Sequence, residues 1–487
     1  MAAMSGKSPT KQMTLEKMAD SVRRAEYAVR GEIYLAAQER IKAGKEVIFT
    51  NVGNPHGLGQ KPLTFIRQVM ALVTAPFLLE DPRATSLFPS DVIARAKQYM
   101  AAVPGGIGAY SDSKGLGIVR EEVAQFIEDR DGVRADPEMI FLTNGASEAV
   151  RMVLRGLVRG PIDAIMVPVP QYPLYSASIA LYDGSFLGYN LDESTGWMLD
   201  MPAIRASYKE AQEQGLCVRA FVFINPGNPT GNCLSRESLM ELVEFCYTNK
   251  LVMLADEVYQ ENIYQTAHPF VSSRSVLHSM GEPYASGVEL VSFHTVSKGV
   301  YGECGLRGGY MEFTNIDPRA IDELYKIASI NLSPNVPGQI AMGLMCNPPR
   351  PGDESYPNHM KEKDELLQSL IRRAKLIVDA FNSAEGITCE ETEGALYAFP
   401  QLHLPPGAME AAAAAGKVPD VFYCLKLLEE TGISTVPGSG FGQKDGSFHF
   451  RTTILPAEDK MHGIVQNFLR FHKNFMRQYG SGSRSRL

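Results

Sequence analysis

Lys298 lies between a strand-like run and a glycine-rich stretch, in the segment SFHTVSKGVYGECGLRGGY that spans residues 292–310. A lysine amine can form an imine with a carbonyl group and can also carry a proton between two reacting atoms. Arg307 follows in the same segment among glycines, which let the backbone approach a ligand closely. A solvated surface loop would also contain both cations, so the rest of the chain must decide between the two interpretations.

Reactive residue types follow four short apolar runs of the sequence. The runs, each given with the reactive residues that follow it in the chain, are 139–142 with Ala146 and Ser147, 220–224 with Asn228, 251–255 with Asp256 and Tyr259, and 288–293 with Thr295, Ser297 and Lys298. Short continuous apolar runs are typical of strands that are buried on both faces. In open α/β sheets, ligands bind at the carboxyl ends of the strands. We therefore expect all four segments to meet at one edge of a mostly parallel sheet.

The residues after Ser147 have the spacing of an amphipathic helix. Apolar side chains recur along one face, at Val150, Val153, Leu154, Leu157 and Val158. Ala146 and Ser147 are therefore expected at a helix N-terminus, where free amide groups and the helix dipole attract an anion. A serine N-cap without any ligand would show the same pattern. The other segments at this edge favour the anion site.

Length and composition restrict the class of protein. The chain has 487 residues, of which 45% are hydrophobic and 21% charged, as is typical of a globular protein with two domains. Its formal net charge of −8 argues against a nucleic-acid or anionic-membrane partner, because either would need a basic face. The seven cysteines include no Cys-x-x-Cys pair and the nine histidines are not closely paired, so we expect neither disulfides nor a metal site.

The pattern of apolar runs and expected helices changes along the chain and indicates two domains. Residues 80–350 alternate short apolar runs with amphipathic helices, which predicts a large α/β domain. After hinge-like residues 348–352, strand-like pieces near 395–399 and 448–452 predict a smaller α+β domain. The expected division is 1–50 as an N-terminal arm and helix packed on the small domain or a dimer partner, 80–350 as the large domain, 51–79 and 351–479 as the small domain, and 480–487 as a flexible tail.

The C-terminus ends in Ser485-Arg486-Leu487. Ser-Lys-Leu at this position is a peroxisomal address, and arginine keeps the charge that a receptor would read. A tripeptide is a weak signal alone, but its place on a flexible tail would make it accessible. We therefore expect a peroxisomal protein, with the cytoplasm as the alternative.

The motifs together resemble the class I, or fold-type I, pyridoxal-phosphate aminotransferases, from the N-terminal region to beyond Arg451. The most diagnostic stretches are Asn228-Pro229-Thr230-Gly231, Asp256-Glu257-Val258-Tyr259, and Ser297-Lys298 with Arg307. Each stretch is short, but their order and spacing make the combination specific. The resemblance implies a large cofactor domain with a mostly parallel sheet, a smaller α+β domain, pyridoxal 5′-phosphate as cofactor, and a homodimer with shared active sites.

The family's chemistry implies a role for each matched residue around the cofactor ring. Lys298 would form the imine with the cofactor's aldehyde and later move a proton between the substrate's α-carbon and the cofactor. Asp256 would keep the ring nitrogen protonated, while Tyr259 and Asn228 would donate to the oxygen of the ring hydroxyl. Tyr172 would stack on the ring, although core packing alone would explain it nearly as well.

The resemblance also implies residues for the cofactor phosphate and for the substrate. The phosphate would be bound by Ala146, Ser147, Thr295, Ser297 and Arg307. Arg451 would bind the substrate's α-carboxylate, next to Asn228 and the backbone of Gly53. Tyr110 would reach the phosphate in the neighbouring subunit's site.

Longer stretches narrow the resemblance within the family. VIFTNVGNPHGLGQKPLTF, VPVPQYPLYSA, SFHTVSKGVYGECG and STVPGSGFGQ resemble the alanine aminotransferase branch, and within it the glutamate:glyoxylate aminotransferases of photorespiration. This implies transfer of an amino group from glutamate or alanine to glyoxylate, or to 2-oxoglutarate or pyruvate. The alternatives are an alanine aminotransferase of general nitrogen metabolism, a lyase with the same cofactor, and a non-catalytic binding module. Val300 and Tyr301 depart from the larger or aromatic pair that is usual in relatives, and they support no substrate claim.

Overall fold

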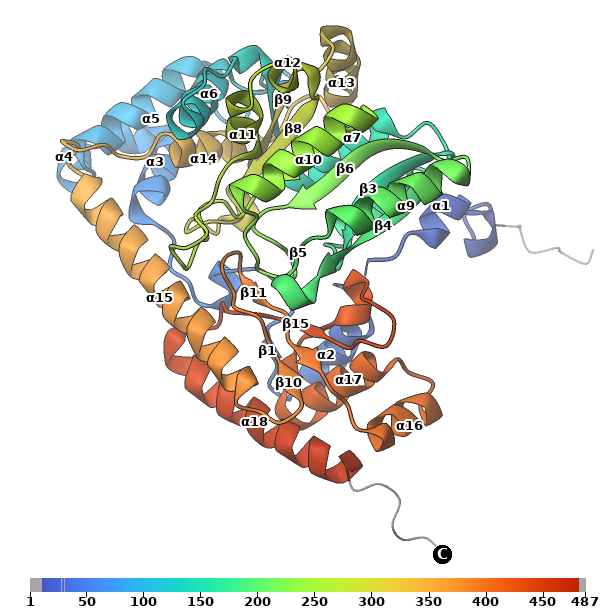
Figure 1. Ribbon diagram of the computed structural model, residues 1–487. Helices are drawn as coiled ribbons and strands as arrows, with labels where there is room; N and C mark the ends of the chain where they lie inside the picture. Colours follow the sequence, from blue (N-terminus) through green and yellow to red (C-terminus); the bar gives the residue numbers. More distant parts are fainter. Residues whose placement is uncertain (1–10, 28, 30, 481–487) are drawn as a thin grey trace, which may run out of the picture.

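The computed structural model describes residues 11–27, 29 and 31–480, and its centre is an eight-stranded sheet in the order β2-β9-β8-β7-β6-β3-β4-β5 (Figure 1). The strands are β2 Ile140–Thr143, β3 Asp163–Val169, β4 Ser185–Asp192, β5 Met198–Leu199, β6 Cys217–Ile224, β7 Val252–Asp256, β8 Leu290–Thr295 and β9 Gly309–Thr314. The central pairs from β8 through β7, β6 and β3 to β4 are parallel, whereas β9 and β5 run antiparallel to their neighbours. The mostly parallel sheet expected from the sequence is confirmed.

Side chains of the central strands alternate between two helical layers. On β6, Phe221 and Phe223 pack toward α9 (Met201–Glu213), α10 (Arg236–Asn249) and α11 (Ser273–Ser279). Val222 and Ile224 pack instead toward α7 (Ala146–Leu157), α8 (Leu174–Leu181) and α13 (Pro318–Ile330). The short helix α12 (Tyr284–Gly287) precedes β8. Because both faces of the sheet are covered, its strands appear as continuous apolar runs in the sequence.

A third group of helices covers the edge of the sheet near β2 and β9. It contains α3 (Thr64–Thr74), α5 (Ser90–Ala102), α6 (Gly117–Asp131) and α14 (Val336–Cys346), which share one hydrophobic cluster. The short helix α4 (Ala84–Leu87) precedes α5. Val300 and Tyr301 belong to this cluster and are buried. The Val300 carbonyl accepts a hydrogen bond from Gln60 Nε2 at 2.9 Å. The departure from the pair usual in relatives therefore lies in the packed core, and neither residue lines the cavity described below.

The C-terminal part forms a smaller α+β unit, which lies below the sheet in Figure 1. Its elements are α15 (Tyr356–Asn382), β10 (Ile387–Thr388), β11 (Tyr397–Ala398), β12 (Gln401–Leu402), α16 (Pro406–Ala414), α17 (Pro419–Thr431), β13 (Ile433–Ser434), β14 (Val436–Pro437), β15 (Phe450–Thr453) and α18 (Glu458–Gly480). β11, β15 and β14 form an antiparallel sheet, and β13 pairs in parallel with β1 (Ile48–Phe49). The strand-like pieces expected near 395–399 and 448–452 are confirmed as β11 and β15.

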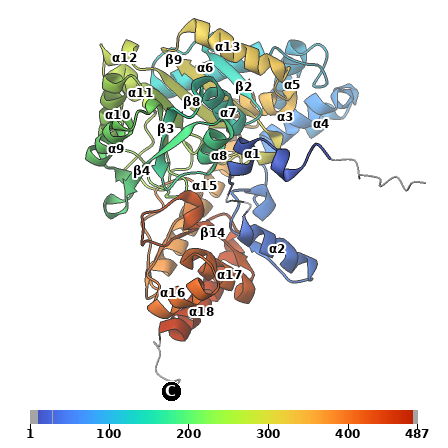
Figure 2. The ribbon, with the colours of Figure 1, turned by 90° about the vertical axis from the view of Figure 1, so that its right-hand side faces the viewer.

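The N-terminal elements divide between the two parts. α1 (Asp20–Arg24) contacts α8, and Arg24 forms an ion pair with Asp183. α2 (Glu32–Lys42) packs on α17 of the smaller unit, as Figure 2 shows. α3 packs on α5 and α14, in the cluster of the larger part. We therefore propose the domain division expected from the sequence with one change, which moves residues 64–74 from the small domain to the large one.

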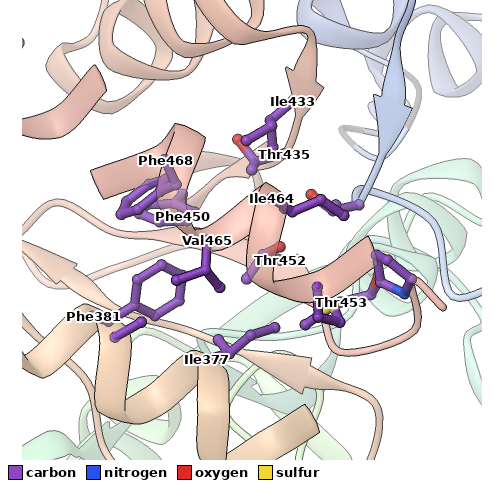
Figure 3. A pocket seen from close by; sticks show the side chains of 14 residues that line it. Ile377, Phe381, Ile433, Thr435, Phe450, Thr452, Thr453, Ile464, Val465 and Phe468 are labelled. Carbon is purple, nitrogen blue, oxygen red and sulfur yellow. The ribbon is translucent and has the colours of Figure 1, made fainter. Parts of the chain in front are cut away.

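A small apolar cavity of about 30 Å³ lies inside the smaller unit (Figure 3). Figure 3 shows Ile377, Phe381, Phe450 and Phe468 around it, and none of its lining residues is ionisable. With no acid or base in its lining, this cavity does not suit acid–base chemistry. No helix in the described ranges is long and apolar enough to cross a membrane. Residues 1–10 and the tripeptide Ser485-Arg486-Leu487 lie outside the described residues.

Candidate active site

A cavity of about 400 Å³ lies beside the carboxyl ends of β6, β7 and β8 and the N-terminus of α7. Nearly all the residues singled out in the sequence line it, namely Gly53, Ala146, Ser147, Tyr172, Asn228, Asp256, Tyr259, Thr295, Ser297, Lys298, Arg307 and Arg451. Tyr110 is the exception, because its side chain is 77% exposed and lies elsewhere. The four strand-end segments therefore meet at one edge of the sheet, together with one strand of the smaller unit.

Lys298 lies three residues beyond the end of β8 and lines the cavity. Its Nζ donates a hydrogen bond to the Gly53 carbonyl at 3.3 Å and lies 5.5 Å from the centre of the Tyr259 ring. The next residue, Gly299, has a φ of 70°, and its N–H donates to Asn262 Oδ1 at 2.8 Å. The amine is therefore held inside the protein, and the interpretation of this segment as a solvated loop is wrong.

Asp256 ends β7 and is buried at the cavity wall. Its Oδ2 accepts a hydrogen bond from the Tyr175 hydroxyl at 2.9 Å, while its Oδ1 has no partner among the described residues. Burial raises the pKa of the Asp256 carboxyl to about 6, against the opposing effects of Tyr175, the Val258 amide and the Lys298 charge. A buried carboxylate with an unused oxygen is costly without a cationic donor, and a protonated ring nitrogen would supply one.

An anion cradle lies at the N-terminus of α7. The helix begins at Ala146 after Gly145, which has a φ of 82°, so its first amides are free to bind an anion. The Arg307 guanidinium lies against the same turn and donates to the Asn144 carbonyl at 3.0 Å and to Ser297 Oγ at 3.4 Å. Two sources of positive potential, the helix N-terminus and Arg307, therefore act on one point.

Thr295 differs from the expectation in one respect. Its hydroxyl donates to the Gly308 carbonyl at 2.7 Å and lies 3.1 Å from the hydroxyl of Ser297. A hydroxyl has a single proton, so Thr295 has none left to donate to a phosphate oxygen in this arrangement. We therefore propose that Thr295 orients Ser297, which remains the hydroxyl donor of the cradle.

Arg451 reaches the cavity from β15 of the smaller unit and is 1% exposed. Its Nη1 donates to Asn228 Oδ1 at 3.0 Å, and its Nη2 donates to the Asn51 carbonyl at 2.6 Å. The rings of Tyr397 and Phe441 lie on the guanidinium, with their centres 4.2 Å and 4.7 Å from Cζ. A guanidinium fixed by rings and by hydrogen bonds is a rigid fork for a carboxylate.

Several residues of the site were missed by reasoning from the sequence. They are Tyr27, Asn51, Tyr175, Cys304 and Tyr397. Tyr175 could have been found, because PQYPLYS places a second tyrosine three residues after Tyr172, one helical turn away. The hydroxyl of Tyr27 lies 2.7 Å from that of Tyr172, but the segment around Tyr27 contains no motif. Contacts of this kind are visible only in three dimensions.

Comparison with known proteins gives the class of the chain. The sequence pattern of the family described as "Aminotransferase class I and II" matches residues 81–466. Glutamate–glyoxylate aminotransferase 1 of Arabidopsis thaliana is 60% identical over 469 residues, which cover 96% of this chain and 98% of that protein. Alanine aminotransferase 2 of Panicum miliaceum is 50% identical over 477 residues, which cover 96% of this chain and 99% of that protein. The chain therefore belongs to the class I and II aminotransferases and is an aminotransferase.

A solved structure supports the same classification. An alanine aminotransferase from Pyrococcus furiosus matches with a TM-score of 0.74 at 25% identity, over 94% of this chain and all of that chain. The fold-type I architecture and the resemblance to the alanine aminotransferase branch are thus confirmed. The cofactor of this class is pyridoxal phosphate.

The residues of the cavity fit pyridoxal phosphate. The unpartnered Oδ1 of Asp256 matches a protonated ring nitrogen, and the amine of Lys298 matches the aldehyde. The phosphate matches the cradle formed by Ala146, Ser147, Ser297 and Arg307. Glycine is required there, because a Cβ on Gly309 would lie only 2.8 Å from the backbone nitrogen of Ala146. The chain therefore supplies each of the three attachments that the cofactor needs.

Proposed function

We propose that the enzyme transfers the amino group of glutamate or alanine to glyoxylate. The observation that carries the proposal is the 60% identity, along nearly the full length, to a glutamate–glyoxylate aminotransferase, against 50% to an alanine aminotransferase. The convergence of Lys298 and Arg451 in one cavity supports the same reaction. Arg451 offers a fork for the α-carboxylate that every amino acid and 2-oxo acid carries, and Lys298 offers the amine.

The roles proposed for the residues around the ring rest on the family resemblance and on their places in the cavity wall. Lys298 binds the cofactor covalently through Nζ and holds the proton that moves during the reaction. Bound pyridoxal phosphate supplies the electron sink that makes the substrate's α-proton acidic. Asp256 keeps the ring nitrogen charged, and Tyr175 fixes the orientation of its carboxylate through the 2.9 Å hydrogen bond. Tyr259 and Asn228 would lie beside the ring oxygen, and Tyr172 would cover the ring.

The remaining residues bind the two anionic ends. Ala146, Ser147, Ser297 and Arg307 hold the phosphate, and each charge-assisted hydrogen bond contributes about 1.5–3 kcal/mol. Arg451, with Asn228 and the backbone of Gly53 beside it, binds the substrate's α-carboxylate. Because Arg451 belongs to the smaller unit and Asn228 to the larger part, substrate binding would hold the two together.

The proposal includes a homodimer in the peroxisome. Tyr110, which is 77% exposed in the single chain, would reach the phosphate in the neighbouring subunit's site. The address would be Ser485-Arg486-Leu487, which lies outside the described residues. Deleting these three residues from a fluorescent fusion should change a punctate signal to a diffuse one, whereas an unchanged signal would contradict the address.

Rates for all pairs of donor and acceptor test the substrate assignment. Glutamate, alanine and serine are combined with glyoxylate, pyruvate and 2-oxoglutarate, and glyoxylate is expected to be the acceptor with the highest kcat/KM. Higher values for pyruvate and 2-oxoglutarate with every donor would instead identify an alanine aminotransferase of general nitrogen metabolism.

Replacing Lys298 tests the covalent attachment. Lys298→Ala should lose the visible absorption of the lysine-bound cofactor and more than about 10³-fold of the turnover. The control is Lys326→Ala, which removes a surface amine paired with Glu323 at 2.6 Å. If Lys298→Ala kept both the absorption band and full turnover, the assignment would be wrong.

A further inference from the structure

His449 connects the smaller unit to the larger part, beside the strand that carries Arg451. It lies two residues before Arg451 in the chain, and its side chain is 1% exposed. Its ring stacks on Phe399 of the smaller unit at 4.8 Å between centres and meets Trp197 of the larger part edge-on at 5.6 Å. The roles proposed above leave this buried imidazole unassigned.

Hydrogen bonds on one side of the ring place a proton on His449 Nδ1. Asp420 accepts from the amides of Val421 and Ser439, as an ionised carboxylate does. Gln443 Nε2 donates to Asp420 Oδ2 at 3.0 Å, which turns Gln443 Oε1 toward His449 Nδ1 at 3.1 Å. An amide oxygen can only accept, so the bond to Nδ1 needs a proton on the ring.

The other ring nitrogen faces a carboxylate. His449 Nε2 lies 3.1 Å from both oxygens of Glu193, which directly follows β4 in the larger part. An ionised carboxylate can only accept, so this bond also needs a proton on the ring. An imidazole with a proton on each nitrogen is a cation. The geometry therefore fits an ion pair between the larger part and the smaller unit.

The surroundings of the ring favour its charged form. His449 and Glu193 line a cavity of about 660 Å³ between β4 of the larger part and β10 and β12 of the smaller unit. The other charged groups in its lining are Asp192, Asp200, Glu390 and Lys444. Burial and the charges of Glu193 and Glu391 raise the pKa of the Glu390 carboxyl, in agreement with a negative potential. The thiol of Cys389, which interacts with Glu390 and Glu193, stays neutral because burial raises its pKa to about 12.

The ion pair connects the two sides of the site that would bind the α-carboxylate. In the larger part, the Trp197 carbonyl accepts from Asn232 Nδ2 at 2.9 Å, and Asn232 follows the turn that carries Asn228. In the smaller unit, β15 begins directly after His449 and presents Arg451, whose Nη1 donates to Asn228 Oδ1 at 3.0 Å. Holding the imidazole in place therefore holds the guanidinium against that turn.

We propose that His449 is a positioning residue whose imidazolium, paired with Glu193, holds Arg451 in place for the substrate's α-carboxylate. His449 does not line the cavity of Lys298, so it acts through Arg451. When the pH rises, the imidazolium loses one N–H proton to solvent, the ion pair is lost, and amino acids and 2-oxo acids bind more weakly. The inference deepens the proposed function and rests on the binding of the α-carboxylate by Arg451.

A purely structural role for His449 is the competing explanation, because its ring also packs between Phe399 and Trp197. Lost packing in His449→Gln would act equally at every pH, whereas a lost ion pair matters only while the wild type has one. The ratio of KM between His449→Gln and the wild type should therefore be about tenfold at pH 6 and below about twofold at pH 9.5, with kcat within about threefold. Ionisations of Lys298 and of the substrate occur in both proteins and cancel in the ratio. A ratio that does not change with pH would refute the inference.

Glu193→Gln tests the other member of the pair and also decides the matter if His449→Gln fails to fold. The Glu193 side chain is 30% exposed, and glutamine keeps a polar group beside the ring while removing the charge. Glu193→Gln should raise KM by about five- to tenfold at pH 6, and adding it to His449→Gln should raise KM no further. The matched control is Glu390→Gln, which removes another carboxylate from the same cavity and should leave KM within about twofold. Multiplying effects in the double variant, or an equal effect of Glu390→Gln, would contradict a specific pair.

Arg451→Lys separates failure of this inference from failure of the proposed function. It removes the fork itself, so KM for glutamate and for every 2-oxo acid should rise by more than about tenfold at both pH values. An unchanged KM in Arg451→Lys would refute the carboxylate site and the inference with it. A raised KM in Arg451→Lys, together with a pH-independent ratio for His449→Gln, would refute the ion pair alone. Glyoxylate, pyruvate and 2-oxoglutarate share the α-carboxylate, so these results do not depend on which acceptor is preferred.

Discussion

Asp256 shows how the surroundings of a single residue would favour a bound cation. Its carboxyl is buried, its pKa is raised to about 6 from the ordinary value of 3.8, and one oxygen has no partner in the described part of the chain. In the cofactor-free protein at neutral pH, Asp256 is therefore mostly ionised in a place that penalises the charge. A protonated ring nitrogen would remove the penalty, so the same residue links stability, pH and cofactor binding.

The pH dependence of unfolding should reveal this penalty. Because the folded pKa of Asp256 lies above the unfolded one, its contribution to stability is complete below about pH 4 and is lost as the pH rises through about 6. Asp256→Asn removes the titration, so its unfolding free energy relative to the wild type should improve by about 1 kcal/mol between pH 5 and pH 7 without cofactor. Urea unfolding at the two pH values measures the difference. A difference that does not change with pH would show that Asp256 is not buried as described.

At the scale of elements, the phosphate cradle depends on close contact between β9 and the start of α7. A Cβ on Gly309 would lie 2.8 Å from the Ala146 nitrogen and from the Gly145 carbonyl carbon, and backbone atoms cannot move aside as a side chain can. Gly309→Ala should therefore displace the helix N-terminus, cost about 1–3 kcal/mol of stability and weaken cofactor binding by at least about tenfold.

The control for this variant is a glycine with free space around it. Gly463 lies within α18, is exposed, and has no heavy atom within 4 Å of an added Cβ. Gly463→Ala should keep cofactor affinity and gain up to about 1 kcal/mol from helix propensity. Thermal unfolding and cofactor titration of both variants decide the matter. Equal cofactor affinity in Gly309→Ala and the wild type would contradict the proposed cradle.

Some residues of the site could be predicted from the sequence and others could not, and the reason is how each residue reaches the cavity. Asp256 and Lys298 follow directly from their own strands, so a local pattern predicted that they would meet at the carboxyl edge of the sheet. Tyr397 and Asn51 join the site through contacts with Tyr259 and Arg451, far away in the chain, and no local pattern encodes such contacts. Resemblance to the family predicted Arg451, which spacing alone could not have placed. The occupied hydroxyl of Thr295 likewise needed atomic geometry.

For the whole molecule, the cavity is built where the larger part and the smaller unit meet. Arg451 of the smaller unit bonds to Asn228 of the larger part. His449, which directly precedes β15, has its Nε2 3.1 Å from both carboxylate oxygens of Glu193. Because Glu193 directly follows β4, this contact connects the smaller unit to the larger part. Both contacts fix the position of the strand that presents the guanidinium. The site in one chain would nevertheless remain incomplete if the phosphate also needs Tyr110.

Heterodimers of Lys298→Ala and Tyr110→Ala chains should regain activity at limiting cofactor if Tyr110 completes the neighbouring subunit's site. Lys298→Ala removes the amine of its own site, and Tyr110→Ala removes the phenol offered to the partner. A dimer of one chain of each kind then has one site with both groups intact, so doubly tagged, purified heterodimers should have about half the wild-type turnover. Each variant alone should have far less when the cofactor concentration lies below the weakened Kd of Tyr110→Ala. If Tyr110 served its own subunit, neither site of the heterodimer would be intact, and mixing would restore nothing.

The control for this experiment is Tyr247→Ala, which removes another exposed tyrosine, on α10. Tyr247→Ala should retain full activity as a homodimer, whereas Tyr110→Ala should bind cofactor more weakly by about 10- to 100-fold, the value of one lost hydrogen bond to a charged group. A chain that stays monomeric during sedimentation at all concentrations would contradict the shared site outright. Two results together would assign the exposed phenol of Tyr110 to the partner's phosphate: recovery of half the activity in the heterodimer, and weaker cofactor binding in Tyr110→Ala. A Tyr110 that served its own subunit would not give the recovery.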